Sequence, residues 1–418
     1  MGHRTRKSKI CHIIWMRMDV SRIREDFPTI KGKKGTYLDS ACQTLRPYQV
    51  IDAITSYYYE FPSCGGRSVH SMATKVSMAV DASRETVASF FGCRDARSFI
   101  FTKNCTEGMN IVSKGFGLRK GDAVLTTDME HNSNHVQWIE MAKDIGIRRK
   151  ITRTSKDGEF DIEDFKKEMS RDVKLVSVLH TSNVTGSSVP VREVTEIAHD
   201  KGAAVLIDGA QAAPHMPVDL EKLDVDFYSI SMHKMLGPSG MGILYGKGKR
   251  LTELRPLISG GGTVGLATYD SVNLTAHPEK FEAGLMDYAG IMGTAAALKY
   301  LSDIGMSNVR AHGLRLQKLI GKELSDIPSL SIVGPKDPND RGGIFSFNIN
   351  GMNPHDIAVM LDNADNIMIR SGMHCAHPFF ISRNINGCAR ASFHVYNNDE
   401  DIIRFTEAVK KLAAAFSK

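Results

Sequence analysis

The stretch "AAVLID" at residues 203–208, followed at once by "GAQ", has the character of a buried strand that ends at Asp208. Strands that are covered on both faces read as nearly continuous apolar runs. Helical segments such as "VREVTEIAHDKG" lie between several runs of this kind. The runs are at 98–101, 123–127, 174–180, 203–208, 227–231 and 242–246. Alternating strands and helices predict an α/β fold with a mostly parallel sheet that has helices on both sides.

The pattern changes after a glycine-rich stretch at 259–263 and a helical stretch at 290–305. From about residue 306 a helix is followed by strands at 343–349 and 366–371 and by a last helix that runs to Lys418. This order predicts a second, smaller α+β domain.

The expected domain boundaries follow from these changes. We expect a large domain over 36–305 and a small domain over 306–418. Residues 18–35 are assigned to the small domain, because chain termini commonly lie close together at the surface. Residues 1–17 carry five basic residues and no acidic residue. We expect them to be a disordered or non-native extension.

Composition excludes several classes of protein. The net charge is +6, but 48 basic and 47 acidic residues remain once 1–17 are set aside, so no basic footprint for nucleic acid is expected. The sequence contains no run of 18 uncharged apolar residues, so no membrane span is predicted. The seven cysteines are odd in number and form no C-x-x-C pair, which favours a reduced, cytoplasmic protein.

Two residues at predicted strand ends point to one cofactor. Asp208 ends one strand, and Lys234 closely follows the strand at 227–231. In open α/β sheets, ligands bind beyond the carboxyl ends of the strands. Alone, Asp208 is as well explained as a helix cap, and Lys234 as a surface lysine. Together they are the lysine that attaches to pyridoxal phosphate and the acid that holds the proton of its pyridine nitrogen.

Two further stretches support a cofactor site. Thr106 lies at the start of a predicted helix, whose first N–H groups would hold a phosphate. The alternative for this residue is an ordinary N-cap. His131 follows the strand at 123–127 and would lie flat over a ring, although a solvated loop histidine is the alternative.

Cys375 has the strongest local reason to be reactive among the seven cysteines. It lies in a short loop with His374, His377 and Arg370 nearby, and cationic neighbours favour a thiolate. A zinc site built from Cys375 and the two histidines is the metal alternative. It lacks the paired spacing of structural zinc, so no metal is predicted. Cys388 is expected in the core.

Nine motifs occur in an order that resembles a known family. They are "YLDSA", "TEGMN", "MEHNSN", "HTSNVTG", "LIDGAQ", "SMHKMLGPSG", "FEAG", "RSGMHCA" and "ARASFHVYN". From about Tyr37 to the end, the chain resembles the cysteine desulfurases of the class V aminotransferase group. The short loop around Cys375 is similar to the second desulfurase type, which also includes selenocysteine lyases. The resemblance implies the aspartate-aminotransferase fold type I and pyridoxal phosphate as cofactor.

The resemblance also implies roles for individual residues. Lys234 would carry the cofactor, Asp208 would face its pyridine nitrogen, and Gln211 its phenolic oxygen. His131 would stack on the ring and act in catalysis, and Cys375 would take up sulfur. The phosphate would be bound by Thr106, Ser231 and His233, with Cys105 beside them, and the substrate carboxylate by Asn183 and Arg390, with Arg370 close by.

Three departures from the family pattern stand out. Cys105 replaces a threonine in the "NCTEG" stretch. Leu285 replaces a threonine that normally reaches the phosphate in the partner subunit. The stretch at 63–70 is looser than usual, although Arg67 and His70 remain.

The implied activity is that of a homodimer that converts L-cysteine to L-alanine and leaves a persulfide on Cys375. The sulfur would pass to an acceptor protein or an iron–sulfur scaffold. A selenocysteine lyase, an aminotransferase and an epimerase are the enzymatic alternatives, and retained Cys375 disfavours the last two. A non-catalytic partner protein is a remote alternative, because Lys234 and Asp208 are both present.

Overall fold

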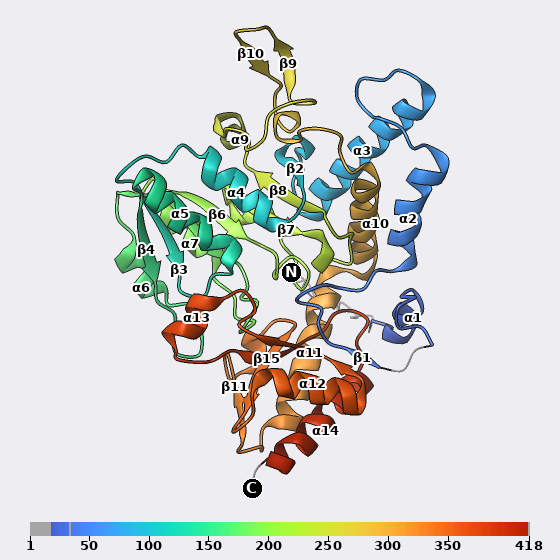
Figure 1. Cartoon of the computed structure of the whole chain (residues 1–418), viewed down its shortest axis with the longest axis vertical. Helices are drawn as coiled ribbons and strands as arrows, with labels where there is room; N and C mark the ends of the chain where they lie inside the picture. The colour runs from blue at the N-terminus through green and yellow to red at the C-terminus, as the bar shows by residue number, and fades with distance from the viewer. Residues whose placement is uncertain (1–17, 33–34, 417–418) are drawn as a thin grey trace, which may run out of the picture.

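A computed structural model describes residues 18–32 and 35–416, so the extension expected at 1–17 lies outside the described residues. A seven-stranded sheet forms the centre of the upper part of the molecule in Figure 1. Its strands are β2 (Phe99–Thr102), β3 (Ala123–Thr127), β4 (Arg148–Thr152), β5 (Val173–Leu179), β6 (Ala204–Asp208), β7 (Phe227–Ser231) and β8 (Gly242–Gly246).

The strand order in this sheet is β2-β8-β7-β6-β5-β3-β4. The strands β4, β3, β5, β6 and β7 pair in parallel, and only β8 pairs antiparallel with its two neighbours. The predicted α/β fold with a mostly parallel sheet is therefore confirmed. The strand β4 was not predicted, because its sequence "RRKIT" is charged and forms a partly exposed edge strand.

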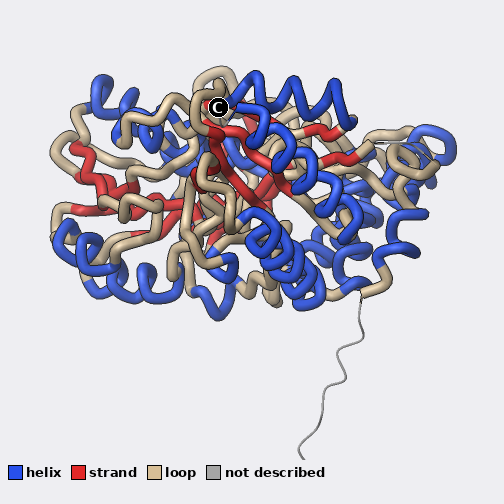
Figure 2. The backbone as a smooth tube through the Cα atoms, turned by 90° about the horizontal axis from the view of Figure 1, so that it is seen from below, coloured by secondary structure: helices blue, strands red, loops and turns tan. Residues whose placement is uncertain are grey.

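Helices cover both faces of the sheet, as Figure 2 shows from below. The first ten are α1 (Val20–Glu25), α2 (Tyr48–Glu60), α3 (Ser71–Phe90), α4 (Cys105–Gly115), α5 (Val136–Ile145), α6 (Ile162–Glu168), α7 (Val191–Asp200), α8 (Leu220–Leu223), α9 (Lys249–Glu253) and α10 (Tyr288–Ile304). The helices α4 and α5 pack their apolar side chains against one face of the sheet. The helices α3, α6, α7 and α10 pack theirs against the other face.

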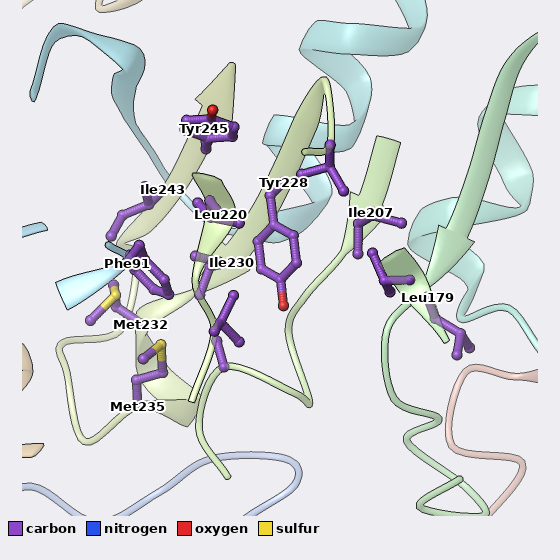
Figure 3. Close-up of a cluster of buried hydrophobic side chains, with 14 of the residues drawn as sticks. Phe91, Leu179, Ile207, Leu220, Tyr228, Ile230, Met232, Met235, Ile243 and Tyr245 are labelled. Carbon is purple, nitrogen blue, oxygen red and sulfur yellow. The ribbon is translucent and has the colours of Figure 1, made fainter. Parts of the chain in front are cut away.

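Alternate residues of one strand enter two separate cores. In β6, Val205 and Ile207 belong to one buried cluster, and Ala204 and Leu206 to the other. Figure 3 shows part of the first cluster, in which Tyr228 and other side chains of β6, β7 and β8 lie together. Because both faces are buried, both sets of side chains are apolar, which accounts for the continuous apolar runs.

A second sheet occupies the lower part of Figure 1. It is antiparallel, with strand order β11-β12-β15-β14. Its strands are β11 (Leu330–Ile332), β12 (Ile344–Ile349), β14 (Arg370–Gly372) and β15 (Cys388–Ser392). The helices of this part of the chain are α11 (Met306–Leu324), α12 (Pro354–Asp365), α13 (His377–Ser382) and α14 (Asp399–Phe416). A separate buried cluster contains Leu316, Phe347, Leu361 and Phe405.

The strand predicted over 366–371 is wrong as a single element. The chain forms β13 (Ile367–Met368), which pairs in parallel with β1 (Thr36–Tyr37), and then β14, which pairs with β15. Hydrophobicity alone does not reveal this change of partner. The pairing of β1 with β13 brings the start of the described chain to its C-terminal part.

The segment after the glycine-rich stretch contains a hairpin that was not predicted. It consists of β9 (Val264–Ala267) and β10 (Val272–Leu274), and it projects at the top of Figure 1. Leu266 and Tyr269 are exposed there. The expected domain boundary near residue 305 stays a prediction. Among the described residues, no helix combines the length and apolar character needed to cross a membrane.

Candidate active site

A cavity of about 240 Å³ lies at the carboxyl ends of β5, β6 and β7. All the site residues predicted from the sequence line it. They are Cys105, Thr106, His131, Asn183, Asp208, Gln211, Ser231, His233, Lys234, Arg370, Cys375 and Arg390. The parallel strands bring these loops together because their carboxyl ends meet at one edge of the sheet.

Asp208 is the last residue of β6 and is buried. Its Oδ1 atom accepts hydrogen bonds from the backbone N–H of Ala210, at 3.0 Å, and from the thiol of Cys105, with the sulfur at 3.2 Å. Within the part of the chain that the structure describes, Oδ2 accepts none. One carboxylate oxygen is therefore available to a donor in the cavity.

Lys234 ends the short 3₁₀ turn Met232–Lys234 that follows β7. Burial lowers the pKa of its amine, which opposes the effect of nearby Asp208. Its Nζ atom has no hydrogen bond or ion pair with any described residue. Burial thus favours the neutral amine, which is the form that attacks an aldehyde.

His131 lies in the loop that follows β3. Burial and the nearby charge of Lys234 lower the pKa of its imidazole to about 4, so the ring is neutral at pH 7. Its Nδ1 atom accepts from the backbone N–H of Ser133 at 3.1 Å. The proton of the neutral ring is therefore on Nε2. The sequence argument did not single out Ser133, whose hydroxyl also bonds Thr106 at 2.7 Å.

The start of α4 lies at the same cavity. The N-cap is Asn104, whose side chain accepts from the N–H of Glu107, so the alternative reading of Thr106 as an N-cap is wrong. The helix approaches β7 closely at Gly108, where an added Cβ would meet Ser229 Oγ at 2.2 Å. The first N–H groups of a helix lack intrahelical partners and attract anions.

Two more predicted phosphate ligands lie beside this helix start. Ser231, the last residue of β7, accepts from the backbone N–H of Cys105 at 2.9 Å. Burial lowers the pKa of His233 to about 4, so this histidine is a neutral hydrogen-bonding group at pH 7. Hydroxyls, a neutral imidazole and helix N–H groups together suit a phosphate.

Arg390 and Asn183 also line the cavity. Both are buried. Arg390 donates from Nη1 to the carbonyl of Asn183 at 2.9 Å, and its Nη2 lies 3.3 Å from Asp39 Oδ1. Arg390 Nε and Asn183 Oδ1 are buried without a hydrogen-bond partner among the described residues. Unpaired polar atoms at this position favour a polar ligand such as a carboxylate.

Arg370 stands directly opposite Arg390 in the pairing of β14 with β15. Its Nη1 atom donates to the sulfur of Cys42 at 2.6 Å. Cys42 also lines the cavity, although the sequence argument gave it no role. Its position directly after the "YLDSA" motif was the available signal.

Cys375 is exposed and lies on a turn with unusual backbone geometry. His374 and Cys375 have φ angles of 47° and 58°, which is the left-handed region that few residues other than glycine adopt. The carbonyl of Cys375 accepts from Asn132 N, and that of His374 accepts from Asn183 Nδ2, both at 2.7 Å. Loops that follow β3 and β5 therefore hold this turn over the cavity.

The expected cationic surroundings of Cys375 are only partly present. Burial, together with nearby Arg390, lowers the pKa of His374 to about 2, so this histidine is neutral. Arg370 bonds Cys42 and makes no hydrogen bond to Cys375. Among the described residues, no group of three His, Cys, Asp or Glu side chains is arranged to hold a metal ion. Cys388 is buried, as expected.

The cavity fits pyridoxal phosphate. Asp208 Oδ2 is available for the pyridine nitrogen, and Lys234 Nζ for the aldehyde. Gln211 donates one amide proton to the carbonyl of Ala41 at 2.8 Å and keeps a second for the phenolic oxygen. The buried Oε1 of Gln211 has no partner in the described chain. Donors for the phosphate lie at the start of α4 and the end of β7.

Comparison with known proteins agrees with this assignment. The family model for "Aminotransferase class-V" matches residues 36–405. The chain is 37% identical to the cysteine desulfurase of Haloferax volcanii, with 96% of this chain and 98% of that protein covered. It is also 37% identical to a probable cysteine desulfurase of Halalkalibacterium halodurans, with 96% and 99% covered.

Solved structures give the same result. The apo structure of a cysteine desulfurase from Thermococcus onnurineus superposes with a TM-score of 0.92 at 34% identity, covering 96% of this chain and 99% of that one. The cysteine desulfurase CsdA of Escherichia coli superposes with a TM-score of 0.87 at 29% identity, covering 95% and 99%. The chain therefore belongs to the cysteine desulfurases of the aminotransferase class-V family, and its cofactor is pyridoxal phosphate.

Proposed function

We propose that Cys375 of this enzyme takes the sulfur of L-cysteine as a persulfide, with Lys234 and Asp208 serving the cofactor. The observation that carries the proposal is the presence of these three residues around one cavity. When bound, pyridoxal phosphate supplies an electron sink for negative charge at the substrate α-carbon.

Lys234 would first attach to the cofactor and then act as a base. Burial lowers the pKa of its amine, which favours the neutral form that can bond to an aldehyde. With the substrate bound, Nζ of Lys234 would be the base that takes the α-proton. Asp208 Oδ2, which has no bond to a described residue, would hold the proton of the pyridine nitrogen.

Arg390 and Asn183 would hold the substrate carboxylate. The unpaired Nε of Arg390 and the second amide proton of Asn183 are donors of the kind that a carboxylate needs. An arginine can bind a carboxylate through two parallel hydrogen bonds, which also fixes its orientation. This orientation determines which substrate bonds face Lys234 and Cys375.

Cys375 and His131 would act at the substrate sulfur. The thiolate of Cys375 forms a bond to that sulfur while the bond from sulfur to the β-carbon breaks. The electron pair of the broken bond passes to the β-carbon, which takes a proton and becomes the methyl group, and Lys234 would return a proton to the α-carbon to give L-alanine. The Nε2–H group of His131, which also lines the cavity, would donate a hydrogen bond to the sulfur, and the persulfide stays on Cys375.

The test is Cys375→Ala, with Cys64→Ala as the matched control at another exposed cysteine. We expect the first variant to bind pyridoxal phosphate normally and to lose alanine formation from L-cysteine almost completely. Alkylation followed by mass spectrometry should place the persulfide of the wild type on the peptide that contains Cys375. The proposal would be contradicted if Cys375→Ala formed alanine at the wild-type rate. It would also be contradicted if the persulfide were found only on a peptide that lacks Cys375.

The sulfur acceptor and the assembly also belong to the proposal. The exposed position of Cys375 permits transfer of the persulfide to an acceptor protein or an iron–sulfur scaffold. Exposed apolar side chains over 257–285, including Ile258, Leu266 and Leu285, support a homodimer interface on that side. A cytoplasmic location remains our expectation from the cysteine content.

A further inference from the structure

Cys105 is placed to act on Asp208. It is the first residue of α4, and it is buried. Its sulfur lies 3.2 Å from Asp208 Oδ1 and 3.4 Å from the carbonyl oxygen of Ser229. Burial, together with the charge of Asp208, raises the pKa of this thiol well above its ordinary value. The sulfur therefore keeps its proton and is a hydrogen-bond donor.

The backbone of Cys105 is fixed to the neighbouring strand β7. Its N–H group donates to the hydroxyl of Ser231 at 2.9 Å. Its carbonyl accepts from the hydroxyl of Ser229 at 3.0 Å. The helix also packs closely against β7 at Gly108, where an added Cβ would meet Ser229 Oγ at 2.2 Å. The sulfur is consequently held beside Asp208 by contacts that do not involve the cofactor.

The orientation of the Asp208 carboxylate depends on such donors. The terminal torsion of an aspartate is intrinsically broad, so its carboxylate plane is set by its hydrogen bonds. Both donors to Asp208, the thiol of Cys105 and the N–H of Ala210, act on Oδ1. Two donors on one oxygen restrict rotation of the plane, while Oδ2 of this cavity-lining residue bonds no described residue.

We infer that Cys105 is a positioning residue, whose S–H group holds the Asp208 carboxylate in the orientation in which Oδ2 meets the pyridine nitrogen of the cofactor. The inference rests on the proposed role of Asp208. It gives a buried thiol a role in this active site that is separate from sulfur transfer, since the persulfide forms on Cys375.

Three variants separate this role from packing. Cys105→Ala removes the donor, Cys105→Ser keeps a donor of smaller size, and Cys93→Ala controls for loss of a half-buried thiol that bonds only a backbone carbonyl. We expect Cys105→Ala to weaken binding of pyridoxal phosphate to the apoenzyme by roughly three- to tenfold. Cys105→Ser should bind at least as tightly as the wild type, because a hydroxyl is a stronger donor than a thiol. If the sulfur only fills space, Cys105→Ser should bind no better than Cys105→Ala.

The absorption band of the bound cofactor gives a second readout. We expect the pH dependence of this band in Cys105→Ala to differ from that of the wild type. In Cys105→Ser it should match the wild type again. Thermal unfolding of each apoenzyme reports whether the variant is folded. If Cys105→Ser is unfolded, Cys105→Thr takes its place as the variant that keeps a donor; if Cys105→Ala is unfolded, Cys105→Val takes its place as the variant without one, and the same order of affinities is required.

A double-mutant cycle with Asp208→Asn tests the route of the effect. If Cys105 acts through Asp208, adding Cys105→Ala to Asp208→Asn should cause no further loss of cofactor affinity. Full additivity of the two losses would overturn the inference. An Asp208→Asn variant with wild-type affinity and spectrum would instead show that the proposed role of Asp208 is wrong. An effect of Asp208→Asn combined with wild-type behaviour of Cys105→Ala removes only the inference.

Discussion

At the scale of single residues, the site is governed by how buried polar atoms are paired. Arg390 is bonded through Nη1 and Nη2, while its buried Nε lacks a partner among the described residues. An unpaired donor of this kind costs about 1–3 kcal/mol. If Arg390 binds the substrate carboxylate as we propose, the carboxylate accepts the missing hydrogen bond, and that free energy is recovered on binding.

The variant Arg390→Lys tests this account, because lysine keeps the charge but loses the planar arrangement of donors. We expect kcat/KM for L-cysteine to fall by about tenfold or more, from the loss of a charge-assisted hydrogen bond. Affinity for pyridoxal phosphate should change little, since we propose that Arg390 binds the substrate carboxylate and not the cofactor. Steady-state kinetics and a cofactor titration measure the two quantities. Loss of cofactor affinity without loss of kcat/KM would contradict the assignment.

At the residue scale the sequence anticipated which side chains meet, but not how they pair. Lys234 and Asp208 follow from their positions at strand ends. The contacts of Cys42 with Arg370 and of Ser133 with His131 depend on how loops fold back over the sheet. The neutrality of His374 depends on its burial, and a histidine in a loop sequence carries no sign of that.

At the scale of elements, the short approach between α4 and β7 positions the predicted phosphate ligands. Gly108→Ala would introduce a Cβ atom 2.2 Å from Ser229 Oγ and 3.2 Å from Ser229 Cβ, so the Ser229 hydroxyl would have to turn away and the helix would be pressed off the strand. We expect at least a tenfold loss of cofactor affinity, because a shift of α4 moves Thr106 and the helix N–H groups.

Gly313→Ala in α11 is the matched control, since nothing lies within 4 Å of its added Cβ. Alanine there should be neutral or stabilising by up to about 1 kcal/mol. Cofactor titration and thermal unfolding distinguish the two variants, and unchanged affinity in Gly108→Ala would contradict the role of this approach.

The strands that the sequence predicted best are those with one environment along their length. The bounds expected for β3, β7 and β8 match the observed ones, since each strand is buried throughout. The strand β4 was missed because an edge strand tolerates charge. The break between β13 and β14 was missed because it reflects a change of pairing partner, from β1 to β15.

At the scale of the whole molecule, buried histidines set the expected dependence of stability on pH. Burial lowers the pKa of His180, His215 and His312 to about 4, as it does for His131 and His233. Between pH 6.5 and 4 these groups bind protons in the unfolded chain but not in the folded one. Their contribution to stability is therefore present above pH 6.5 and is lost as the pH falls. Glu130, whose pKa burial raises to about 8, acts in the opposite direction, but it is a single group.

We expect the free energy of unfolding of the apoenzyme to decrease by several kcal/mol from pH 7 to pH 5, because each pKa unit corresponds to about 1.4 kcal/mol. Urea denaturation at the two pH values measures the change, and equal or greater stability at pH 5 would contradict it.

The proposed dimer gives a prediction for the exposed Leu285. Its side chain is 73% exposed in the single chain. In the family that the sequence resembles, this position supplies a hydroxyl to the phosphate of the partner subunit. We expect Leu285→Thr to bind pyridoxal phosphate about tenfold more tightly, and Leu285→Val, which has the same shape as threonine but no hydroxyl, to leave the affinity unchanged. Light scattering should give the mass of a dimer. A monomer at working concentration would remove the basis of the prediction, and equal affinities would mean that another group already bonds the phosphate.

The turn that carries Cys375 has a consequence for protein engineering. Its two neighbouring loops grip the carbonyl groups of His374 and Cys375 rather than the cysteine side chain. The backbone conformation of this turn is therefore held without any contact that depends on the side chain at position 375. Serine or selenocysteine introduced at position 375 should be presented at the same point above the cavity. The reactivity of a sulfur, an oxygen and a selenium nucleophile can then be compared on the same backbone.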